Sequence, residues 1–409
     1  MRLSFIVFIV LYVLIDVYIF RSLKGMGRGL LSYGYLVVSV GILGNLLIQF
    51  FVVDDGGGRV LSIPRSYAIG FFMSLLLFKV FFLVLFLGEN LIRLIIGGAK
   101  KVSDSGADFA VPERRKFVKN LLLGLAAVPF ASMLYGMYRG KYNYKVLSYE
   151  LEFDDLPDAF DGYTITQVSD IHCGSFDNKE KISYGIDLIN KQQSDLLLFT
   201  GDMVNNRADE LDNWMDLFAT LSAKDGKYAV LGNHDYGDYY EWNSDEEKKA
   251  NLEDLKKRER DMGFDLLLNE NRFIERDGQR LALLGVENWG GGHFIKVGDL
   301  DKAKENVKPD DFKILMSHDP THWEEKVIDD PYHFHLTLSG HTHGMQFGIE
   351  IPGWIKWSPS KWRYKHWAGI YESDRQFINV NRGFGYLAFP GRVGIWPEIT
   401  VIKLKKKLA

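Results

Sequence analysis

The fold is decided by the stretch Tyr163-Thr164-Ile165-Thr166-Gln167-Val168-Ser169-Asp170-Ile171-His172, which starts with β-branched and apolar residues and ends in a carboxylate and an imidazole. Val, Ile and Thr favour extended backbone. A nearly continuous apolar run of this length suits a strand that is buried on both faces. The abrupt change to Asp170 and His172 therefore predicts a buried strand whose carboxyl end carries potential metal ligands.

Four more runs along the chain end in the same way. The clusters that follow them are Gly201-Asp202, Gly232-Asn233-His234-Asp235, Ser317-His318-Asp319 and Gly340-His341-Thr342-His343-Gly344. The intervening segments suit crossover helices, for example 179–193 and 209–223, and a sixth run, 280–285, predicts another strand. This alternation indicates an α/β domain with a largely parallel sheet. Ligands bind at the carboxyl ends of such strands, so we expect the five clusters to converge.

The clusters supply a donor set suited to two metal ions. It contains two Asp, one Asn and four His: Asp170, His172, Asp202, Asn233, His318, His341 and His343. Imidazole binds Zn, Fe, Mn or Ni, and carboxylate oxygen binds harder ions. Two cations about 3.5–4 Å apart neutralise an anionic phosphoryl group and lower the pKa of a bridging water. We therefore predict two divalent ions (Mn, Fe or Zn) and a phosphorylated substrate.

The chain has a single cysteine, Cys173. This excludes an intramolecular disulfide and a cysteine-rich zinc site. Because Cys173 follows directly on His172, we expect it to be a small buried residue beside the site rather than a redox group.

The five clusters, in this order, resemble the signature of the calcineurin-like metallophosphoesterase superfamily. The resemblance implies a four-layer αββα sandwich of two mixed sheets. It also implies that Asp202 bridges two metals and that His234 faces the scissile phosphate and is oriented by Asp235. The first metal would then be held by Asp170, His172 and His343, and the second by Asn233, His318 and His341.

The similarity extends over about residues 145–409. The segments 156–162, 381–385 and 396–399 resemble a membrane-associated bacterial branch of the superfamily. That branch includes twin-arginine-exported phosphoesterases and a UDP-diacylglucosamine pyrophosphohydrolase of lipid A synthesis. One departure is Met345, where many members carry a second glycine after the last histidine.

The N-terminal third is of a different character. Four apolar segments, 3–20, 30–53, 67–87 and 117–138, approach or exceed the roughly 20 residues that cross a bilayer as a helix. We therefore expect a transmembrane region over 1–140 and the phosphoesterase domain over 146–409. Residues 1–145 hold 17 Lys and Arg against 7 Asp and Glu (net +10), which leaves 32 against 46 (net −14) for the rest. So negative a domain is not expected to bind nucleic acid.

Basic residues mark the first and third loops as cytoplasmic, because positively charged loops stay inside. They include Arg21, Lys24 and Arg28 in the first loop and Arg93, Lys100 and Lys101 in the third. This predicts an integral protein of the bacterial inner membrane with its catalytic domain outside the cytoplasm, although the basic segment 139–145 favours the opposite orientation. Arg114-Arg115 resembles a twin-arginine export signal, and its alternative interpretation is a basic membrane flank.

Three further features of the sequence lead to hypotheses about local structure. Asp16 and Lys79 lie inside apolar segments, so we expect them to pair or, alternatively, to reach separate interfaces. Segment 352–367 holds four Trp among basic residues, which suits either a membrane interface or aromatic packing beside the active site. The charged stretch 244–262 predicts a solvated helix.

The sequence therefore predicts a membrane-anchored, dinuclear-metal-dependent phosphoesterase that hydrolyses a phosphate ester or anhydride, with a lipid or cell-envelope compound as one substrate class. A UDP-diacylglucosamine-type pyrophosphohydrolase is an alternative, and it requires a cytoplasmic site. A non-catalytic metal-binding membrane sensor or scaffold is another. The substrate, the native metals and the oligomeric state are left open.

Overall fold

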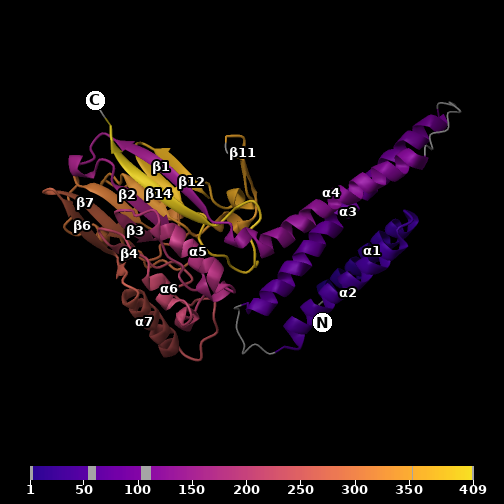
Figure 1. Ribbon diagram of the computed structural model, residues 1–409, viewed down its shortest axis with the longest axis horizontal. Helices are drawn as coiled ribbons and strands as arrows, with labels where there is room; N and C mark the ends of the chain where they lie inside the picture. Colours follow the sequence, from indigo (N-terminus) through magenta and orange to yellow (C-terminus); the bar gives the residue numbers. More distant parts are fainter. Residues whose placement is uncertain (1–2, 54–60, 103–111, 352, 408–409) are drawn as a thin grey trace. The chain divides into compact units, whose positions relative to one another are not determined.

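The computed structural model describes residues 3–53, 61–102, 112–351 and 353–407, which form two units (Figure 1). The first unit comprises Met1–Asp54 and Pro64–Met137, and it is helical. The second unit comprises Asp55–Ile63 and Tyr138–Ala409, and it holds every strand among the described residues.

Four helices build the first unit: α1 (Leu3–Gly25), α2 (Gly29–Phe51), α3 (Ile63–Val102) and α4 (Pro112–Tyr138). In the described part of the chain, three helical stretches are long and apolar enough to cross a membrane: Gly29–Phe51, Ile63–Ile96 and Lys116–Tyr138. Apolar side chains such as Leu30, Val37 and Val84 are exposed on these helices. A surface of this kind suits lipid rather than water.

The helix α3 is much longer than the expected span 67–87. Glu89 and Arg93 follow the expected span but form an i,i+4 ion pair on the same helix, so the helix continues past them. In α4, the side chains of Arg114 and Arg115 lie outside the described residues, so the export-signal hypothesis is not addressed there.

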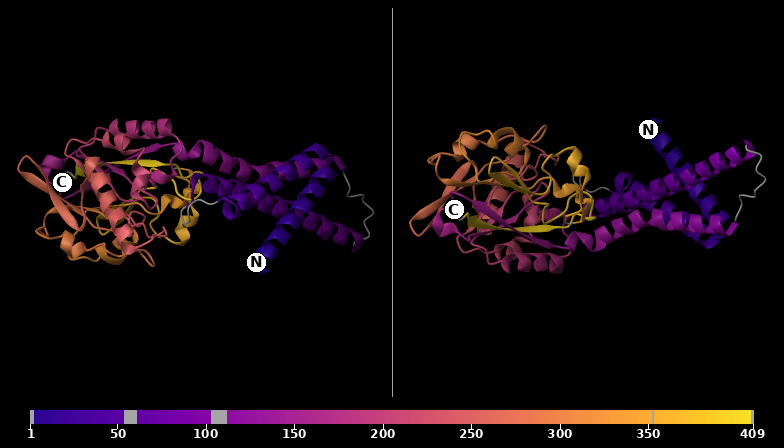
Figure 2. Two further views of the ribbon diagram at one scale, coloured as in Figure 1. Left: turned by 90° about the horizontal axis from the view of Figure 1, so that it is seen from below. Right: turned by 90° about the horizontal axis from the view of Figure 1, so that it is seen from above.

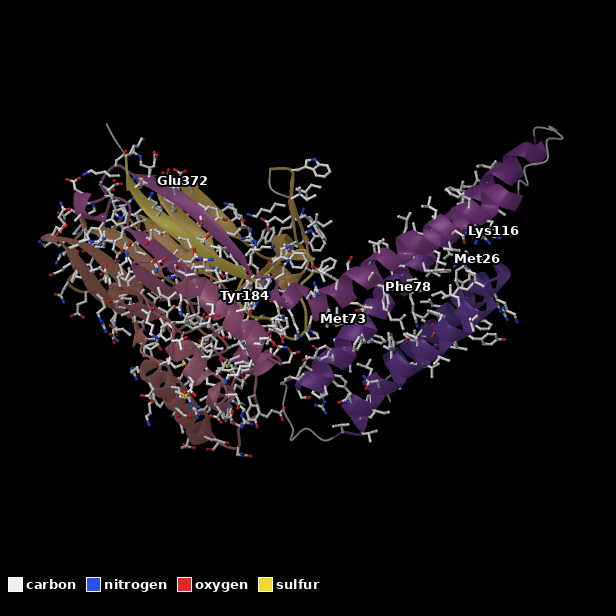
Figure 3. All side chains as sticks on the ribbon, in the orientation of Figure 1. Met26, Met73, Phe78, Lys116, Tyr184 and Glu372 are labelled. Carbon is white, nitrogen blue, oxygen red and sulfur yellow. The ribbon has the colours of Figure 1, made fainter. Side chains whose placement is uncertain are left out.

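The predicted pairing of Asp16 with Lys79 is confirmed. Lys79 Nζ lies 2.7 Å from Asp16 Oδ1, and both side chains are buried. Two residues of α2 complete the cluster: Tyr35 donates to Asp16, and Ser39 Oγ donates to Asp16 Oδ2 at 2.9 Å. Phe78 of α3, labelled in Figure 3, packs nearby against Tyr35 with ring centroids 6.0 Å apart. The charges therefore join α1, α2 and α3 inside an otherwise apolar interior.

We expect Asp16→Asn and Lys79→Gln to destabilise the helical unit non-additively. Removing one partner leaves the other charge buried and unpaired, which costs about 3–5 kcal/mol. Removing both should cost clearly less than the sum of the single effects, measured as unfolding in detergent. The partly buried i,i+4 pair Glu89–Arg93 is the control, with an expected coupling of about 0.5 kcal/mol or less. Additive effects at Asp16 and Lys79 would contradict the pairing.

Two six-stranded mixed sheets form the second unit. The first has the order β1 (Lys145–Phe153), β14 (Glu398–Lys406), β2 (Thr164–Val168), β3 (Leu196–Phe199), β4 (Lys227–Ala229) and β5 (Asp265–Leu266). The second has the order β12 (Gly369–Ser373), β13 (Gln376–Val380), β9 (Leu336–Ser339), β8 (Phe312–Met316), β7 (Gln279–Gly285) and β6 (Glu270–Arg276). Only β14 with its neighbour β2, and the outer pairs β12–β13 and β6–β7, run antiparallel within these sheets.

The sheets pack face to face, with helices on both outer faces. The core between them includes Ile165 and Leu198 of the first sheet and Ile314 and Leu338 of the second. The helices α5 (Lys179–Asn190), α6 (Met215–Ala219) and α7 (Asp245–Asp261) cover the first sheet, and α8 (Leu300–Ala303) with the π-helix η5 (Trp323–Val327) covers the second. Figure 2 shows the magenta and orange segments on opposite sides of the strands. This is the expected four-layer αββα arrangement.

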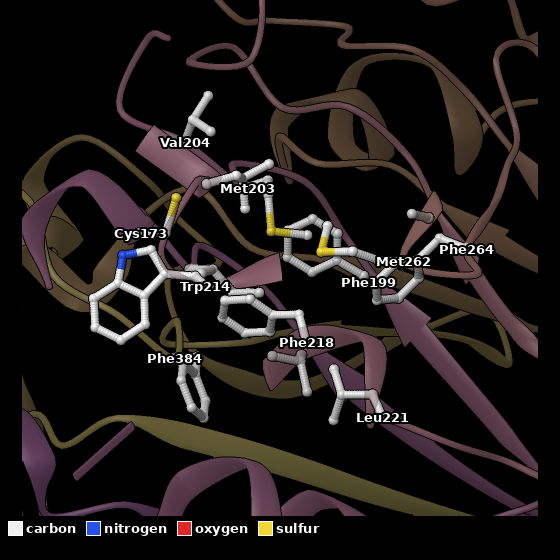
Figure 4. Close-up of a cluster of buried hydrophobic side chains, with 14 of the residues drawn as sticks. Cys173, Phe199, Met203, Val204, Trp214, Phe218, Leu221, Met262, Phe264 and Phe384 are labelled. Atoms are coloured by element: carbon white, nitrogen blue, oxygen red, sulfur yellow. The ribbon is translucent and has the colours of Figure 1, made fainter. Parts of the chain in front are cut away.

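Alternating side chains of the buried strands explain these layers. On β3, Leu196 and Leu198 face the other sheet, whereas Leu197 and Phe199 face the helices. Figure 4 shows the helix-side core, in which Phe199 lies with Phe218, Met262 and Cys173. Cys173 is buried and free, so the expectation of a small filler is confirmed.

The remaining segments match in part. The strand expected at 280–285 is β7, and the solvated helix expected at 244–262 is α7, capped by Ser244. The helix expected over 209–223 is wrong in length: the chain makes only η4 (Ala208–Leu211) and α6 there. A separate two-stranded hairpin, β10 (Ile349–Ile351) with β11 (Ile355–Trp357), follows the last cluster of polar residues.

Candidate metal centre

The five polar clusters follow β2, β3, β4, β8 and β9 and meet at one end of the two sheets. The clusters form two groups of three residues. Each residue offers one potential ligand atom, and within a group these atoms all lie within 4.8 Å of one another. The first group is Asp170, His172 and His343. The second is Asp202, His318 and His341.

In the first group, two imidazoles and a carboxylate point at a common position. His172 Nε2 lies 3.0 Å from His343 Nε2, and His343 Nε2 lies 3.1 Å from Asp170 Oδ1. All three residues are buried. Such a convergence of nitrogen and oxygen lone pairs suits a shared cation.

In the second group, hydrogen bonds direct the ligand atoms inward. His318 Nδ1 lies 2.7 Å from Thr200 O and can donate to it, which leaves the buried Nε2 as the lone-pair nitrogen. Nδ1 of His341 lies 2.8 Å from Asn233 Oδ1, and its Nε2 lies 2.8 Å from the hydroxyl of Tyr364. Asn233 thus joins this group, and the donor set of both groups fits a pair of divalent ions.

Asp202 lies between the two groups. Its Oδ2 is 3.5 Å from His172 Nε2 and 3.1 Å from His318 Nε2. Its Oδ1 accepts a hydrogen bond from the backbone N–H of His234 at 2.8 Å. One carboxylate oxygen therefore faces ligands of both groups, while the other is held by the backbone.

The backbone is strained where it carries these residues. Positive φ angles occur at five of the seven proposed ligands: Asp170 (51°), His172 (49°), Asp202 (62°), His341 (70°) and His343 (48°). Non-glycine residues seldom adopt this region, and strain of this kind gathers at functional sites. Gly340 permits the close approach of two clusters, because a Cβ there would lie 2.3 Å from Asp170 Oδ2.

The pKa shifts favour His172 and Asp202 in the forms that bind a metal ion, whereas they favour His318 as a cation. Burial lowers the pKa of His172 well below its ordinary value, against the opposing effect of Asp202. Burial alone would raise the pKa of Asp202, but the surrounding histidines, His318 first, hold it well below its usual range. Burial would also lower the pKa of His318, yet the carboxylates of Asp202 and Asp170 raise it to about 10. The site therefore stabilises positive charge in a buried position, as cation binding requires.

His234 is held next to both groups without joining either. Its Nδ1 lies 2.8 Å from the carbonyl oxygen of Asn205, which assigns the proton to Nδ1 and the lone pair to Nε2. Its ring lies edge-on to that of His172, with centroids 4.9 Å apart. His234 is partly exposed, whereas most of the neighbouring residues are buried.

Asp235 has a different partner from the one that the resemblance implies. Its carboxylate accepts backbone N–H groups of Gly232, Asp202, Met203 and Val204, at 2.8 to 3.3 Å. The contact that orients the His234 ring is the one to Asn205 O. Asp235 therefore fixes the two loops that carry Asp202 and Asn233, and it acts on His234 only through them.

Several residues of the site are not evident from the sequence motifs. Tyr364 contacts His341, buried Arg392 places Nη2 3.2 Å from His343 Nδ1, and Asp319 Oδ2 lies 3.6 Å from His341 Nε2. Of these three residues, only Asp319 stands in one of the five clusters, and it was not among the predicted ligands. Met345, the departure from the family pattern, is exposed and has a φ of 48°.

We expect Tyr364→Phe to weaken metal binding without unfolding the protein. The hydroxyl is the partner of His341 Nε2, and losing such an outer contact costs about 10- to 100-fold in metal affinity. Titration of the full chain with Mn²⁺ should show one weakened site and one unchanged site. Tyr163→Phe is the control, because its hydroxyl donates to Asp225 and contacts no residue of either ligand group. Equal affinity in Tyr364→Phe and the native chain would contradict this role.

Comparison with known proteins matches both parts of the chain. Residues 163–345 match the family described as "Calcineurin-like phosphoesterase". Residues 1–141 match the family described as "Probable Calcineurin-like phosphoesterase, transmembrane domain".

Curated relatives match most of the chain. The metallophosphoesterase YkuE of Bacillus subtilis is 29% identical over 298 residues, covering 71% of this chain and 97% of its own length. A "Transmembrane protein with metallophosphoesterase domain" from Danio rerio is 25% identical over 374 residues, covering 89% of this chain and 78% of its own.

Likeness to solved structures is weaker. The alignment with the structure of the phosphopantetheinyl hydrolase PptH from Mycobacterium tuberculosis covers 54% of this chain and 89% of the PptH chain. The sequence identity is 13% and the TM-score is 0.33. The two family matches show a calcineurin-like phosphoesterase domain preceded by the transmembrane domain of such phosphoesterases, and together with the relatives' names they indicate a phosphoric ester hydrolase.

Proposed function

We propose that this protein is a membrane-anchored phosphoesterase that depends on two divalent metal ions. The observation that carries the proposal is the position of Asp202 Oδ2, within 3.5 Å of a histidine from each of the two groups. A single structural ion would need only one of these groups. Two groups that share a carboxylate fit a dinuclear centre.

The residues of the site would have three roles: binding the first ion, binding the second ion, and acting on the leaving oxygen. Asp170, His172 and His343 would hold one ion and Asn233, His318 and His341 the other, with Asp202 shared between them. When bound, two ions such as Mn, Fe or Zn would neutralise the phosphoryl group and make a water molecule more acidic. His234 adds a group that this chain supplies itself: Nδ1 is bound to Asn205 O, and when Nε2 also carries a proton, the imidazolium can stabilise the leaving oxygen and protonate it.

The location and the substrate are proposed on separate grounds. The distribution of Lys and Arg favours a catalytic domain outside the cytoplasm, in the bacterial inner membrane. The membrane anchor favours a substrate that is itself at the membrane, a lipid or envelope phosphate ester or anhydride. No nucleic-acid role is proposed, because the domain has a net charge of −14.

Two alternatives remain distinguishable by experiment. A UDP-diacylglucosamine-type pyrophosphohydrolase would use the same centre but would require a cytoplasmic domain. Testing from which side of the membrane the domain is accessible therefore distinguishes this alternative from the main proposal. A metal-binding sensor without turnover would retain the ligands but would not need His234 in place. The ordered contact of His234 with Asn205 O favours the enzyme.

The test is hydrolysis by the full chain in detergent with added Mn²⁺. The panel is p-nitrophenyl phosphate, bis-p-nitrophenyl phosphate, phosphatidyl lipids and UDP-diacylglucosamine. We expect metal-dependent turnover of at least one compound, lost in Asp202→Asn and retained in His333→Ala, a histidine outside both groups. No turnover on any compound, or full activity in Asp202→Asn, would overturn the proposal.

A further inference from the structure

The hairpin β10–β11 has one apolar face. Ile349 pairs with Trp357 and Ile351 with Ile355, whereas Glu350 pairs with Lys356 between them. Because side chains alternate along a strand, the four apolar residues share one face and the charged pair lies on the other. Figure 1 shows this hairpin, labelled at β11, projecting beyond the two sheets of its unit.

Apolar and basic residues continue past the hairpin. Trp354 in its turn is 78% exposed and Trp362 in the short helix η7 (Pro359–Trp362) is 73% exposed. Ile349 and Ile351 are also exposed, as are three basic residues beyond them. We define the tryptophan hairpin surface as Ile349, Ile351, Trp354, Trp362, Lys361, Arg363 and Lys365.

This composition matches a lipid headgroup region better than water. Indole rings combine an apolar body with a polar N–H and gather where a membrane meets water. Lys and Arg near a membrane surface are attracted to anionic lipids by about 1 kcal/mol each. The charge is local: residues 349–367 hold four Lys and Arg and one Glu, and that Glu350 is paired with Arg382, in a domain with a net charge of −14.

The surface is attached to the metal centre at both ends. The hairpin follows the short helix η6 (His343–Gln346), which carries a proposed ligand. Past η7, Tyr364 contacts His341 with its hydroxyl at 2.8 Å. Ser358 Oγ also donates to Gly344 O at 2.6 Å, which closes the loop onto the same segment. A molecule held on this surface would therefore lie near the catalytic residues.

The chain also enters the second unit at this end. Gly140 packs so closely that a Cβ there would lie 2.2 Å from Arg392 O and 2.9 Å from the ring of Trp396. Arg392 in turn contacts His343. Only one residue separates Gly140 from Tyr138, the end of a candidate membrane span. A bilayer is thus the partner that chain connectivity makes available to this end of the domain.

We propose that the tryptophan hairpin surface docks onto the lipid bilayer, with its indoles at the level of the headgroups and its basic residues on anionic lipid. It thereby selects phosphate esters carried by membrane lipids over soluble ones. This preference rests on the proposed phosphoesterase function, whereas the docking itself does not.

Tryptophan fluorescence tests the docking. All nine Trp lie at or after Trp214, so the emission of the full chain reports on the second unit alone. The chain is reconstituted in phosphatidylcholine–phosphatidylglycerol vesicles with brominated acyl chains, which quench nearby indoles. We expect quenching in the native chain, mostly lost in the Trp354→Phe/Trp362→Phe double variant and retained in Trp242→Phe. An unquenched native chain would overturn the proposal and indicate that protein, either a second copy or the helical unit, covers the surface.

Activity tests the substrate preference. Trp354→Ser/Trp362→Ser should lower hydrolysis of a vesicle-borne phosphate ester by about tenfold or more, the effect of losing about 1.4 kcal/mol of docking energy. Hydrolysis of bis-p-nitrophenyl phosphate should be unchanged. Tyr184→Ser, an exposed aromatic residue on α5 labelled in Figure 3, is the control and should affect neither.

The outcomes separate the two proposals. If the native chain hydrolyses nothing but its tryptophans are quenched, the phosphoesterase proposal fails and the docking stands. If both substrates are lost equally in the Ser variant, or neither is affected, the lipid-selecting role is wrong while the phosphoesterase proposal stands.

Discussion

Asp202→Asn should abolish metal-dependent hydrolysis, because it removes the carboxylate that faces both ligand groups. Loss of a residue that only contacts a metal ligand lowers metal affinity by about 10- to 100-fold. Loss of the shared ligand itself should therefore lower metal affinity by at least about 100-fold at both sites. The substitution is isosteric, and an amide oxygen can still accept the backbone N–H of His234. The fold should therefore survive. Metal titration and hydrolysis of bis-p-nitrophenyl phosphate by the full chain provide the two readouts.

Asp195→Asn is the matched control for this variant. Asp195 is a buried carboxylate at the opposite end of the same strand β3, where it accepts hydrogen bonds from Thr164. Its substitution should lower stability but leave metal affinity and turnover close to native. If Asp195→Asn removed activity as completely as Asp202→Asn, the loss would reflect folding rather than the shared ligand.

His234→Ala should lower kcat by about 10²- to 10⁴-fold while leaving metal binding intact, since general acid catalysis contributes in this range. His234 Nδ1 is bound to Asn205 O and its ring adjoins His172 without joining either ligand group. A loss of turnover without a loss of metal affinity distinguishes His234 from the metal ligands. We therefore expect native metal titration together with slow turnover.

Leaving-group dependence sharpens this prediction. A group that protonates the leaving oxygen matters most when that oxygen is strongly basic, so His234→Ala should impair an alkyl ester more than a p-nitrophenyl ester. His333→Ala repeats the same chemical change outside the site and should leave both rates unaffected. Loss of metal binding in His234→Ala, in parallel with loss of turnover, would assign His234 to the ligand set instead.

The ligand clusters could be predicted because each is local to one strand end. A buried strand such as 163–169 is evident from its apolar run, and the polar residues that follow it need only the rule that parallel strands align their carboxyl ends. The pairing of Asp16 with Lys79 was also predictable, since an isolated charge inside an apolar unit is costly. In both cases the signal is local: a polar or charged residue stands at the end of an apolar run or inside one.

Other features depend on contacts that no local pattern encodes. Strands β3 and β8 are both buried and largely apolar, so their sequences do not say that they belong to different sheets. The two-sheet arrangement was implied only by the family resemblance. Tyr364 and Arg392 reach His341 and His343 from 23 and 49 residues away. The backbone carbonyl of Asn205, which orients His234, carries no side-chain signal at all. Hydropathy likewise gave the apolar stretch of α3 but not its 40-residue length.

The most direct test of the two-metal centre is the metal stoichiometry of the full chain. Protein stripped with a chelator is titrated with Mn²⁺ while hydrolysis of bis-p-nitrophenyl phosphate is recorded in parallel. We expect two bound ions per chain, activity that appears as the second site fills, and neither binding nor activity in Asp202→Asn. Full activity in the stripped protein, or a single ion whose binding is indifferent to Asp202→Asn, would contradict the two-metal centre.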